Sequence, residues 1–389
     1  MKAVCKKIIS TLKQHHHVTS GLVMMFVCAG LFFLPSHSAQ NSSDGTKSKA
    51  RVLSIDNSRV QNLGLLLQGE QQLEIEILSG KHKGKRFPAC NQLRAQMELD
   101  KMFEPGDIIL AGIIDGAVPG VTTVRAQDHY RISWSLVLFA LFALLLVIFG
   151  GVTGANALLS FVFSCLFIWK VLVPALLAGC SALVMSFVTV MLLSCVIIVL
   201  VSGFTLKALT ALSGTLLGVL SSCAMAYIFS GIFKINGAVM PYSQALLYSG
   251  FGNISLSEIY IGAIFLSSSG AVMDLAMDVA SSMHEVVLKS EKNSFSELFK
   301  SGLRVGRSVV GTMTTTLLLA YSGGYLTLMM MFCAEGVLPT DFINNPHVAS
   351  EMVKTLIGSF GLVLVAPFTA LSGAWLYSRK SNNKRLCER

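Results

Sequence analysis

Eight stretches of apolar residues, each about as long as a helix that crosses a lipid bilayer, constrain the fold of this chain most strongly. Hydrophobic residues make up 53% of the sequence and charged residues 13%, against roughly 45 to 50% and 25% in soluble proteins. The stretches cover residues 18–34, 133–152, 155–173, 176–202, 208–232, 254–274, 308–332 and 355–377. We therefore expect an all-α polytopic membrane bundle of about seven to eight spans. The stretches that meet at Gly150-Gly151 and at Pro174 are either separate spans or hairpins and re-entrant segments.

Lysine and arginine in the connecting segments predict the orientation of this bundle. Basic residues precede the first stretch, follow the fourth, connect the sixth to the seventh, and end the chain in a basic tail at 379–389. All four groups fall on one side of the predicted membrane domain, 132–378, so both termini should be cytoplasmic. The net charge of +9 follows from this bias, and no interleaved basic and aromatic pattern indicates a nucleic acid partner.

The N-terminal segment, 1–35, has two interpretations. Its basic start, its apolar run and the small residues Ser36 and Ser38 after it fit a cleavable signal peptide as well as a membrane anchor. Under either interpretation the segment that follows is exported.

Residues 36–131 predict an exported β-rich domain, because their composition differs sharply from that of the apolar stretches. The polar stretch from Ser38 to Lys49 indicates a flexible N-terminal linker. Alternating apolar and acidic residues at 73–78 predict a strand that ends in a turn at 79–85, and further strands are predicted at 108–114 and 121–126. We expect a small barrel or sandwich that binds, caps or couples and does not catalyse, because no arrangement of catalytic residue types stands out in it.

An acidic segment continues directly from the sixth apolar stretch. Asp274, Asp278, Ser281 and Glu285 fall on one stripe of a helix, because a helix turns by about 100° per residue. Carboxylates are costly near lipid and usually face a bundle interior or a water-filled cavity, which marks them as functional. Alternatively, the span ends near Met273 and the carboxylates form a solvated helix face.

A stripe of basic and hydroxyl side chains is predicted on the next helix. Ser294 and Glu297 have the spacing of a capping box, so this helix should begin there. Further along, Arg304, Ser308, Gly311 and Thr315 share one face, with Arg307 and Thr312 on its edges.

The two stripes suggest one candidate site at the cytoplasmic end of the sixth and seventh spans. We hypothesise that Asp274 or Asp278 meets Arg304 or Arg307 there. Such a pair either exchanges charge with a cation or is a structural ion pair that fixes the register of the helices. The candidate residues of this polar path or ion pair are Asp274, Asp278, Ser281, Glu285, Arg304, Arg307, Ser308, Thr312 and Thr315.

Several classes of function have no motif in the sequence. None of the nine cysteines forms a CxxC pair, so no metal site, disulfide framework or redox centre is indicated. The HExxH, GxSxG and Walker patterns are missing as well. We therefore expect no enzymatic activity, no metal, no cofactor and no ATP-driven step.

A series of different short motifs is spread over most of the chain. They are Ser79-Gly80, Gly106-Asp107, Asp128-His129-Tyr130-Arg131, Ser269-Gly270-Ala271-Val272-Met273-Asp274, Glu297-Leu298-Phe299-Lys300-Ser301-Gly302, Val305-Gly306-Arg307, Gly311-Thr312-Met313 and Leu319-Ala320-Tyr321. Together they resemble the YibE/F-like family of multi-pass membrane proteins. The resemblance implies a bacterial cytoplasmic (inner) membrane protein with an exported β-rich segment, and it names no substrate.

Two positions depart from the pattern of that family. The family usually has aspartate after the Gly-Arg pair and asparagine before the Thr-Leu pair, where this chain has Ser308 and Thr315. If those positions handle ions, this chain has lost an acidic ligand.

The leading interpretation is a transporter or permease for an unknown small solute or ion, because many spans with polar interruptions are what a path through lipid requires. The alternative is a non-transporting membrane scaffold or regulator that binds a protein partner through its exported β domain. In both, the lipid bilayer is the environment of the spans.

Overall fold

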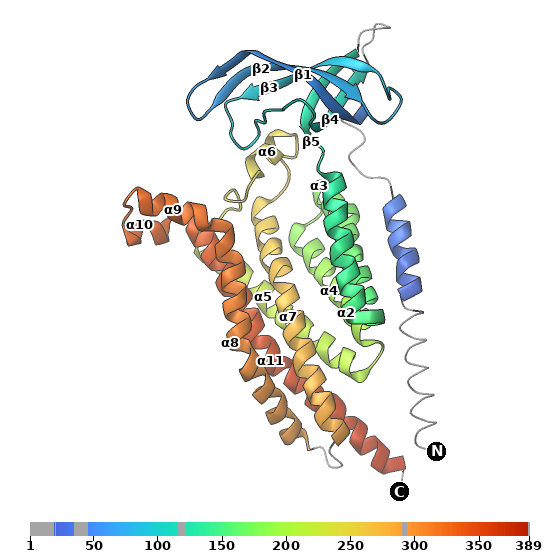
Figure 1. Cartoon of the computed structure of the whole chain (residues 1–389). Helices are drawn as coiled ribbons and strands as arrows, with labels where there is room; N and C mark the ends of the chain where they lie inside the picture. The colour runs from blue at the N-terminus through green and yellow to red at the C-terminus, as the bar shows by residue number, and fades with distance from the viewer. Residues whose placement is uncertain (1–18, 20, 35–45, 116–121, 290–293, 388–389) are drawn as a thin grey trace. The chain divides into compact units, whose positions relative to one another are not determined.

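The computed structural model of the chain describes residues 19, 21–34, 46–115, 122–289 and 294–387 (Figure 1). The chain divides into two compact units, Ser36–Leu145, and Met1–Pro35 together with Leu146–Arg389. The first unit contains a β-barrel and the second is helical. Most of the predicted N-terminal linker and the first half of the predicted segment 1–35 lie outside the described residues.

Five strands close into the barrel in the order β1-β2-β3-β5-β4. Neighbouring strands are antiparallel except β3 and β5, which pair in parallel at Ala89 with Val124 and at Cys90 with Arg125. A closed five-stranded barrel of this order has the architecture of an OB fold, which by itself names no ligand. The strands are β1 Thr46–Asn62, β2 Leu67–Ile77, β3 Arg86–Arg94, β4 Ile108–Asp115 and β5 Thr122–His129.

The predicted strands at 73–78, 108–114 and 121–126 are confirmed as parts of β2, β4 and β5. Two strands, β1 and β3, were missed. The linker prediction is wrong at its end, because Thr46–Lys49 belongs to β1 and pairs with β4. Lysines and hydroxyl residues suit a strand there because alternate side chains point outward, whereas Ala50 and Val52 point into the core.

A buried amide network ties the barrel strands to the segment between β3 and β4. The Gln71 side chain is fully buried and its amide donates to the Phe103 carbonyl at 2.9 Å. Its oxygen accepts from the Phe103 backbone NH and from the Asn91 amide, both at 3.1 Å. Asn91 also donates to the Lys101 carbonyl at 2.6 Å. These bonds satisfy backbone groups that no strand partner satisfies, so they fix this segment against the core.

The Gln71→Leu substitution should loosen this segment. It leaves the NH and the carbonyl of Phe103 without their partner, and each unsatisfied group costs about 1 to 3 kcal/mol. We expect faster amide hydrogen exchange, by mass spectrometry, in peptides that span residues 96–107. Gln72→Leu is the matched control because Gln72 is exposed on the same strand. Equal protection in the two variants would contradict this account of the network.

In the helical unit and the helix that leads into it, six segments are long and apolar enough to cross a membrane within the described residues. They are Ile132–Leu177, Ala182–Ser202, Leu206–Ile232, Leu256–Lys289, Phe295–Ala334 and Pro346–Arg379. The helix Gly21–Phe33 is apolar but shorter. Their elements are α2 Ile132–Phe167, the π-helical turn η2 Ile168–Leu172, α3 Val173–Leu177, α4 Ala182–Ser202, α5 Leu206–Ile232, α6 Ser243–Tyr248, α7 Leu256–Lys289, α8 Phe295–Ser322, the 3-10 turn η3 Gly323–Tyr325, α9 Leu326–Ala334, α10 Pro339–Asn344 and α11 Pro346–Cys387.

The segment Ile132–Leu177 contains a chain reversal near Gly151. Gly151 has φ 55° and ψ −132°, a backbone conformation that glycine adopts at little cost. Gly154 lies against the backbone carbonyl of Leu146, eight residues earlier, whereas a straight helix would separate them by about 12 Å. The predicted stretches 133–152 and 155–173 are therefore two arms of a hairpin, one of the alternatives that the sequence left open.

Two predicted spans differ in position from the helices. The stretch 254–274 is only the first part of α7, which continues to Lys289. The stretch 308–332 begins too late, because α8 starts at Phe295 and the predicted capping box of Ser294 and Glu297 is present. The chain bends at η3 before α9. Apolar content alone misses both starts and ends, because charged residues occupy the exposed faces of these helices.

The core of the helical unit lies where α5, α7 and α11 pack together, because they bury a shared set of apolar residues. Glycines allow these helices to approach closely. A methyl group on Gly214 of α5 would collide with Thr369 of α11, and one on Gly218 would lie 2.9 Å from Val272 of α7. Close helix contacts through small residues are the usual packing in membranes.

The Gly214→Ala substitution should therefore destabilise the helical unit. Forcing an extra methyl group into a packed core costs about 1 to 3 kcal/mol, more than the gain of about 1 kcal/mol in helix propensity. Gly231→Ala is the matched control. Gly231 is on the same helix, and no atom lies within 4 Å of the methyl group that the substitution would add. We expect a lower thermal unfolding midpoint in detergent for Gly214→Ala only. An unfolding midpoint at or above that of the control would show that the contact of Gly214 with Thr369 has room for a methyl group.

Candidate functional site

The acidic stripe predicted on α7 lies on the exposed side of that helix. Asp274, Asp278 and Glu285 are exposed and Ser281 is half-buried. Within this chain these carboxylates do not point into the bundle interior, because apolar residues occupy the inward face of α7; a water-filled cavity and a solvated helix face stay open for them. The buried residues of that part of the helix are Val272, Met273, Leu275, Ala276, Val279, Ala280 and Met283.

The same stripe extends further than the sequence suggested. Ser267 and Gly270 are exposed on the same face, and Ser267 lies seven residues before Asp274. Two helical turns separate such positions, so this spacing was the available signal. The Ser267 hydroxyl is 2.9 Å from the Tyr321 hydroxyl of α8.

The predicted stripe on α8 is exposed along its whole length. Its members are Arg304, Arg307, Ser308, Gly311, Thr312 and Thr315. Its hydroxyls hydrogen-bond to their own helix, as Ser308 does to the Val305 carbonyl at 2.7 Å and Thr312 to the Val309 carbonyl at 2.9 Å. The opposite face, with Leu298, Gly302, Gly306 and Leu317, is buried. The two arginines have no such internal partner among the hydrogen bonds and ion pairs of the described residues.

α7 and α8 pack against each other along a line of contact, which we call the seam. The two stripes lie beside this seam, at the same height along the helix axes. A methyl group on Gly302 would lie 2.8 Å from Met283 Sδ, and one on Gly306 would lie 3.9 Å from Val279. Because the helices are antiparallel, counting from these contacts puts Asp278 level with Arg307. The same counting puts Asp274 level with Gly311 and Thr312.

Both positions are on the exposed side of the seam, where Ser267 and Tyr321 bond. Asp278 is about 20° around α7 from Ser267, and Arg307 about 40° around α8 from Tyr321, by the angular spacing of a helix. Ser267 and Tyr321 bond across this seam. The structure therefore brings Asp278 and Arg307 to one place on the surface of the helical unit.

The hypothesised ion pair does not form within the chain. Among the residues that the structure describes, ion pairs within 4.0 Å include neither aspartate of α7 and neither arginine of α8. The stripes are neighbours, but each keeps its charges free for another contact.

The depth of the carboxylates along α7 decides their importance. The helix has 34 residues, and Asp274 is about 27 Å from Leu256 and about 22 Å from Lys289 at a rise of about 1.5 Å per residue. The hydrocarbon core of a bilayer is about 30 Å thick. A membrane centred on α7 would therefore include Asp274 and Asp278, whereas Glu285 would lie near the interface.

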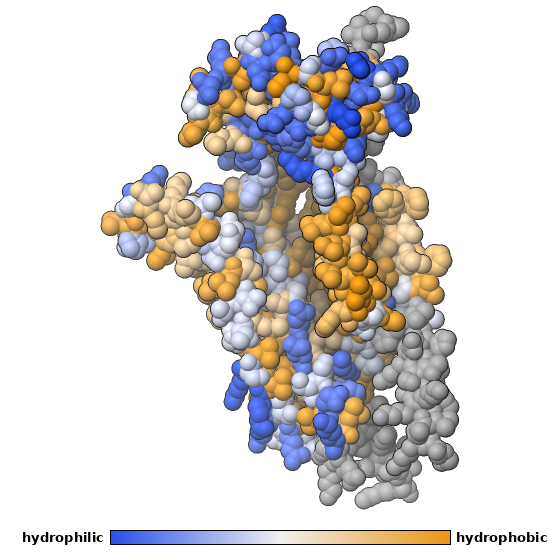
Figure 2. Space-filling model, in the orientation of Figure 1, coloured by the Kyte–Doolittle hydropathy of each residue, from blue (hydrophilic) through white to orange (hydrophobic). Residues whose placement is uncertain are grey.

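The exposed face of α8 differs chemically from that of α2. No residue of the most apolar window of Ile132–Leu177 is buried, and its mean hydropathy is 2.8. The exposed positions of α8 instead carry Arg304, Arg307, Ser308, Thr312 and Thr315. Figure 2 shows hydrophobic residues over α2 and hydrophilic residues over α7 and the lower half of α8. The face of α2 suits lipid, and the face of α8 does not.

The barrel has a cluster of charges where β5 ends and α2 begins. Asp128 accepts from Lys101 Nζ at 2.8 Å and from Arg131 Nη1 at 2.7 Å. His129 Nδ1 is 3.8 Å from Asp107. Burial opposes the charged form of Asp128, but the hydrogen bonds from Lys101 and from the His129 backbone NH outweigh it and hold its pKa below the usual value. The cluster anchors the last strand of the barrel.

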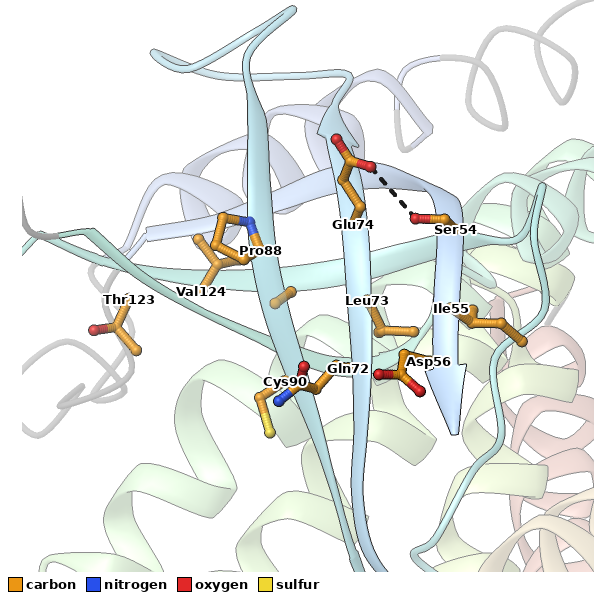
Figure 3. Close-up of a pocket in the computed structure, with 11 residues that line it drawn as sticks. Ser54, Ile55, Asp56, Gln72, Leu73, Glu74, Pro88, Cys90, Thr123 and Val124 are labelled. Atoms are coloured by element: carbon orange, nitrogen blue, oxygen red, sulfur yellow. Dashed lines mark hydrogen bonds between the residues drawn. The ribbon is translucent and has the colours of Figure 1, made fainter. Parts of the chain in front are cut away.

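A groove of about 520 Å³ in the barrel (Figure 3) is lined in part by the buried core residues Leu73, Ala89 and Val124. Its side chains come from β1, β2, β3 and β5. Glu74 accepts a hydrogen bond from Ser54 Oγ at 3.3 Å, and burial raises the pKa of the Cys90 thiol. A thiol of raised pKa is a poor nucleophile, so the groove is suited to binding. The lining residues are Ser54, Ile55, Asp56, Gln72, Leu73, Glu74, Pro88, Ala89, Cys90, Thr123 and Val124.

A family model described as YibE/F-like protein matches residues 138–379. The chain belongs to the YibE/F-like family. The matched range contains α7, α8 and both stripes, so the suspected resemblance is confirmed there. It does not include the barrel, where the similarity of Ser79-Gly80, Gly106-Asp107 and Asp128-His129-Tyr130-Arg131 stays a prediction. No curated protein and no solved structure matches the chain.

The two positions at which the sequence is expected to depart from the family pattern lie on the stripe of α8. Ser308 and Thr315 are exposed and bond to carbonyls of their own helix. An aspartate in place of Ser308 would stand next to Arg307. Among the described residues, no group of three or more histidine, cysteine, aspartate or glutamate residues is placed to hold a metal ion.

The Asp128→Asn substitution should remove a pH-dependent part of the stability of the barrel. Because the pKa of Asp128 is lowered in the folded state, its contribution is present above the ordinary aspartate value of about 4 and is lost as the pH falls through the folded value. We expect the ratio of hydrogen exchange rates, variant over wild type, in β4 and β5 peptides to exceed one at pH 7 and to fall toward one as the pH is lowered below about 4. The exposed Glu104→Gln is the control. A ratio independent of pH would refute the assignment.

Proposed function

We propose that this protein is a membrane transporter or permease for a small solute or ion, whose polar path follows the stripes of α7 and α8 near their cytoplasmic ends. The observation that carries the proposal is the position of Asp274 and Asp278. They lie in the cytoplasmic half of α7, a 34-residue helix long enough to cross a membrane, and are not buried among its apolar neighbours. Carboxylates at such a depth are expensive unless water, an ion or a partner group meets them.

The proposed arrangement in the membrane follows from the same helices. Counting the hairpin at Gly151 as two spans gives seven, and the helix Gly21–Phe33 is the eighth if it is retained. Basic residues gather where α7 ends and α8 begins, which favours a cytoplasmic position for that connection and for both termini. We propose the bacterial inner membrane as the location and an exported barrel.

The energy source for such transport would be a gradient or another protein, because the sequence has no phosphate-binding loop. Carboxylates attract cations, and neighbouring arginines limit how strongly a cation is held. Proton, sodium and potassium fluxes are therefore the first to measure. We propose no enzymatic activity.

The test is cation flux into proteoliposomes that contain the purified protein, followed with ion-sensitive dyes under an imposed membrane potential. We expect flux with the wild-type protein and only the level of empty vesicles with Asp274→Asn. Asp341→Asn is the matched control, because Asp341 is an exposed carboxylate of α10 away from the stripes. Both variants should be inserted in equal amounts. Full flux through Asp274→Asn would eliminate this path.

A second function, a non-transporting scaffold or regulator, is supported by the groove of the barrel. It is lined by both acidic and apolar side chains, as a protein-binding surface is. Under this alternative, no flux is observed with any variant, and Glu74→Lys in the groove abolishes co-purification of a partner while Asp274→Asn does not.

A further inference from the structure

The charged side chains of the exposed stripes on α7 and α8 must be shielded from lipid within the membrane. From this we infer that two copies of the chain associate through the seam between α7 and α8, so that the acidic stripe of each copy faces the basic stripe of the other. The inference rests on the proposed path along these helices and names what closes it: a second copy of this chain.

The first argument is the cost of leaving the stripes uncovered. In a membrane centred on α7, Asp274 and Asp278 would be at the depth of the hydrocarbon core, and Arg307 is level with Asp278. Charged side chains at this depth pair with one another or line water-filled space. Hydroxyls that bond to their own helix tolerate lipid, but these four charges, including Arg304, have no ion-pair partner among the described residues.

The second argument is the distribution of charge on the face. Its acidic groups are on α7 and its basic groups on α8, side by side. A two-fold axis that passes outside the seam places α7 of one copy against α8 of the other, and α8 against α7. The surface is therefore complementary to itself, which is what an isologous interface requires.

The third argument is the level of each charge in the membrane. Both copies have the same topology, so the axis is perpendicular to the bilayer and every residue keeps its depth. Asp278 is level with Arg307 within one copy, and therefore also level with Arg307 of the partner subunit. A partner of unrelated sequence would match these levels only by coincidence.

Asp274 has no charge at its own level on α8. The residues there are Gly311 and Thr312, which are exposed and small. In the dimer the two Asp274 side chains face this uncharged zone, beside the paired charges of Asp278 and Arg307. The interface thus holds its charge pairs on the cytoplasmic side and leaves Asp274 as the group available to a transported cation.

The test uses full-length chains with two different affinity tags, expressed together in the same membranes. Capture through one tag measures how much of the second copy is associated. We expect wild-type copies to be captured together, and capture to fall by about tenfold or more for Asp278→Arg with itself and for Arg307→Asp with itself, because each places like charges opposite each other. Co-expression of Asp278→Arg with Arg307→Asp should restore capture.

This restoration separates pairing between copies from pairing within one copy, because neither of the two chains contains an opposite pair of its own. It also excludes misfolding as the cause of each single loss. Glu335→Arg, an exposed charge reversal near the end of α9, is the control and should be captured like wild type. Absence of wild-type capture, retained capture of either single variant, or loss without restoration would each overturn the inference. Association is measured without flux, so the proposed transport can fail while the dimer stands.

Discussion

The cost of placing charge in hydrocarbon is the constraint on which the helical unit depends. It explains why α7 buries its apolar side against its neighbouring helices, and why its exposed side carries Asp274 and Asp278, one turn apart. A fully apolar helix would satisfy a lipid neighbour at no expense. The carboxylates of α7 therefore make this surface unsuited to contact with lipid. The arginines of α8 at the same height have the same effect.

Much of the candidate site was predictable because it is local. The stripes on α7 and α8 follow from the helical repeat, and the capping box at Ser294 from a spacing of three residues. Which side of α7 would be buried was not predictable, because that depends on α5 and α11, which are distant in sequence. The same reason explains the missed strands. Thr46 of β1 pairs with Ile113 of β4, and no local pattern records a partner 67 residues away.

The barrel and the helical unit satisfy the hydrogen bonds of their polar side chains in different ways. In the barrel, Gln71 and Asn91 are buried and make hydrogen bonds that fix a loop. In the helices, many hydroxyls, such as those of Ser308 and Thr369, bond back to their own turn and so need no partner on a neighbouring helix. Membrane helices need this autonomy because hydrocarbon offers no hydrogen bonds while the bundle assembles.

The reversal at Gly151 has a consequence for biogenesis. It joins two arms of membrane length within one 46-residue apolar segment, and no charged connection stands between them. After the first arm has entered the bilayer, no hydrophilic loop at Gly151 has to be moved across it. The two arms should partition into lipid together, as one unit, while the chain is still being synthesised.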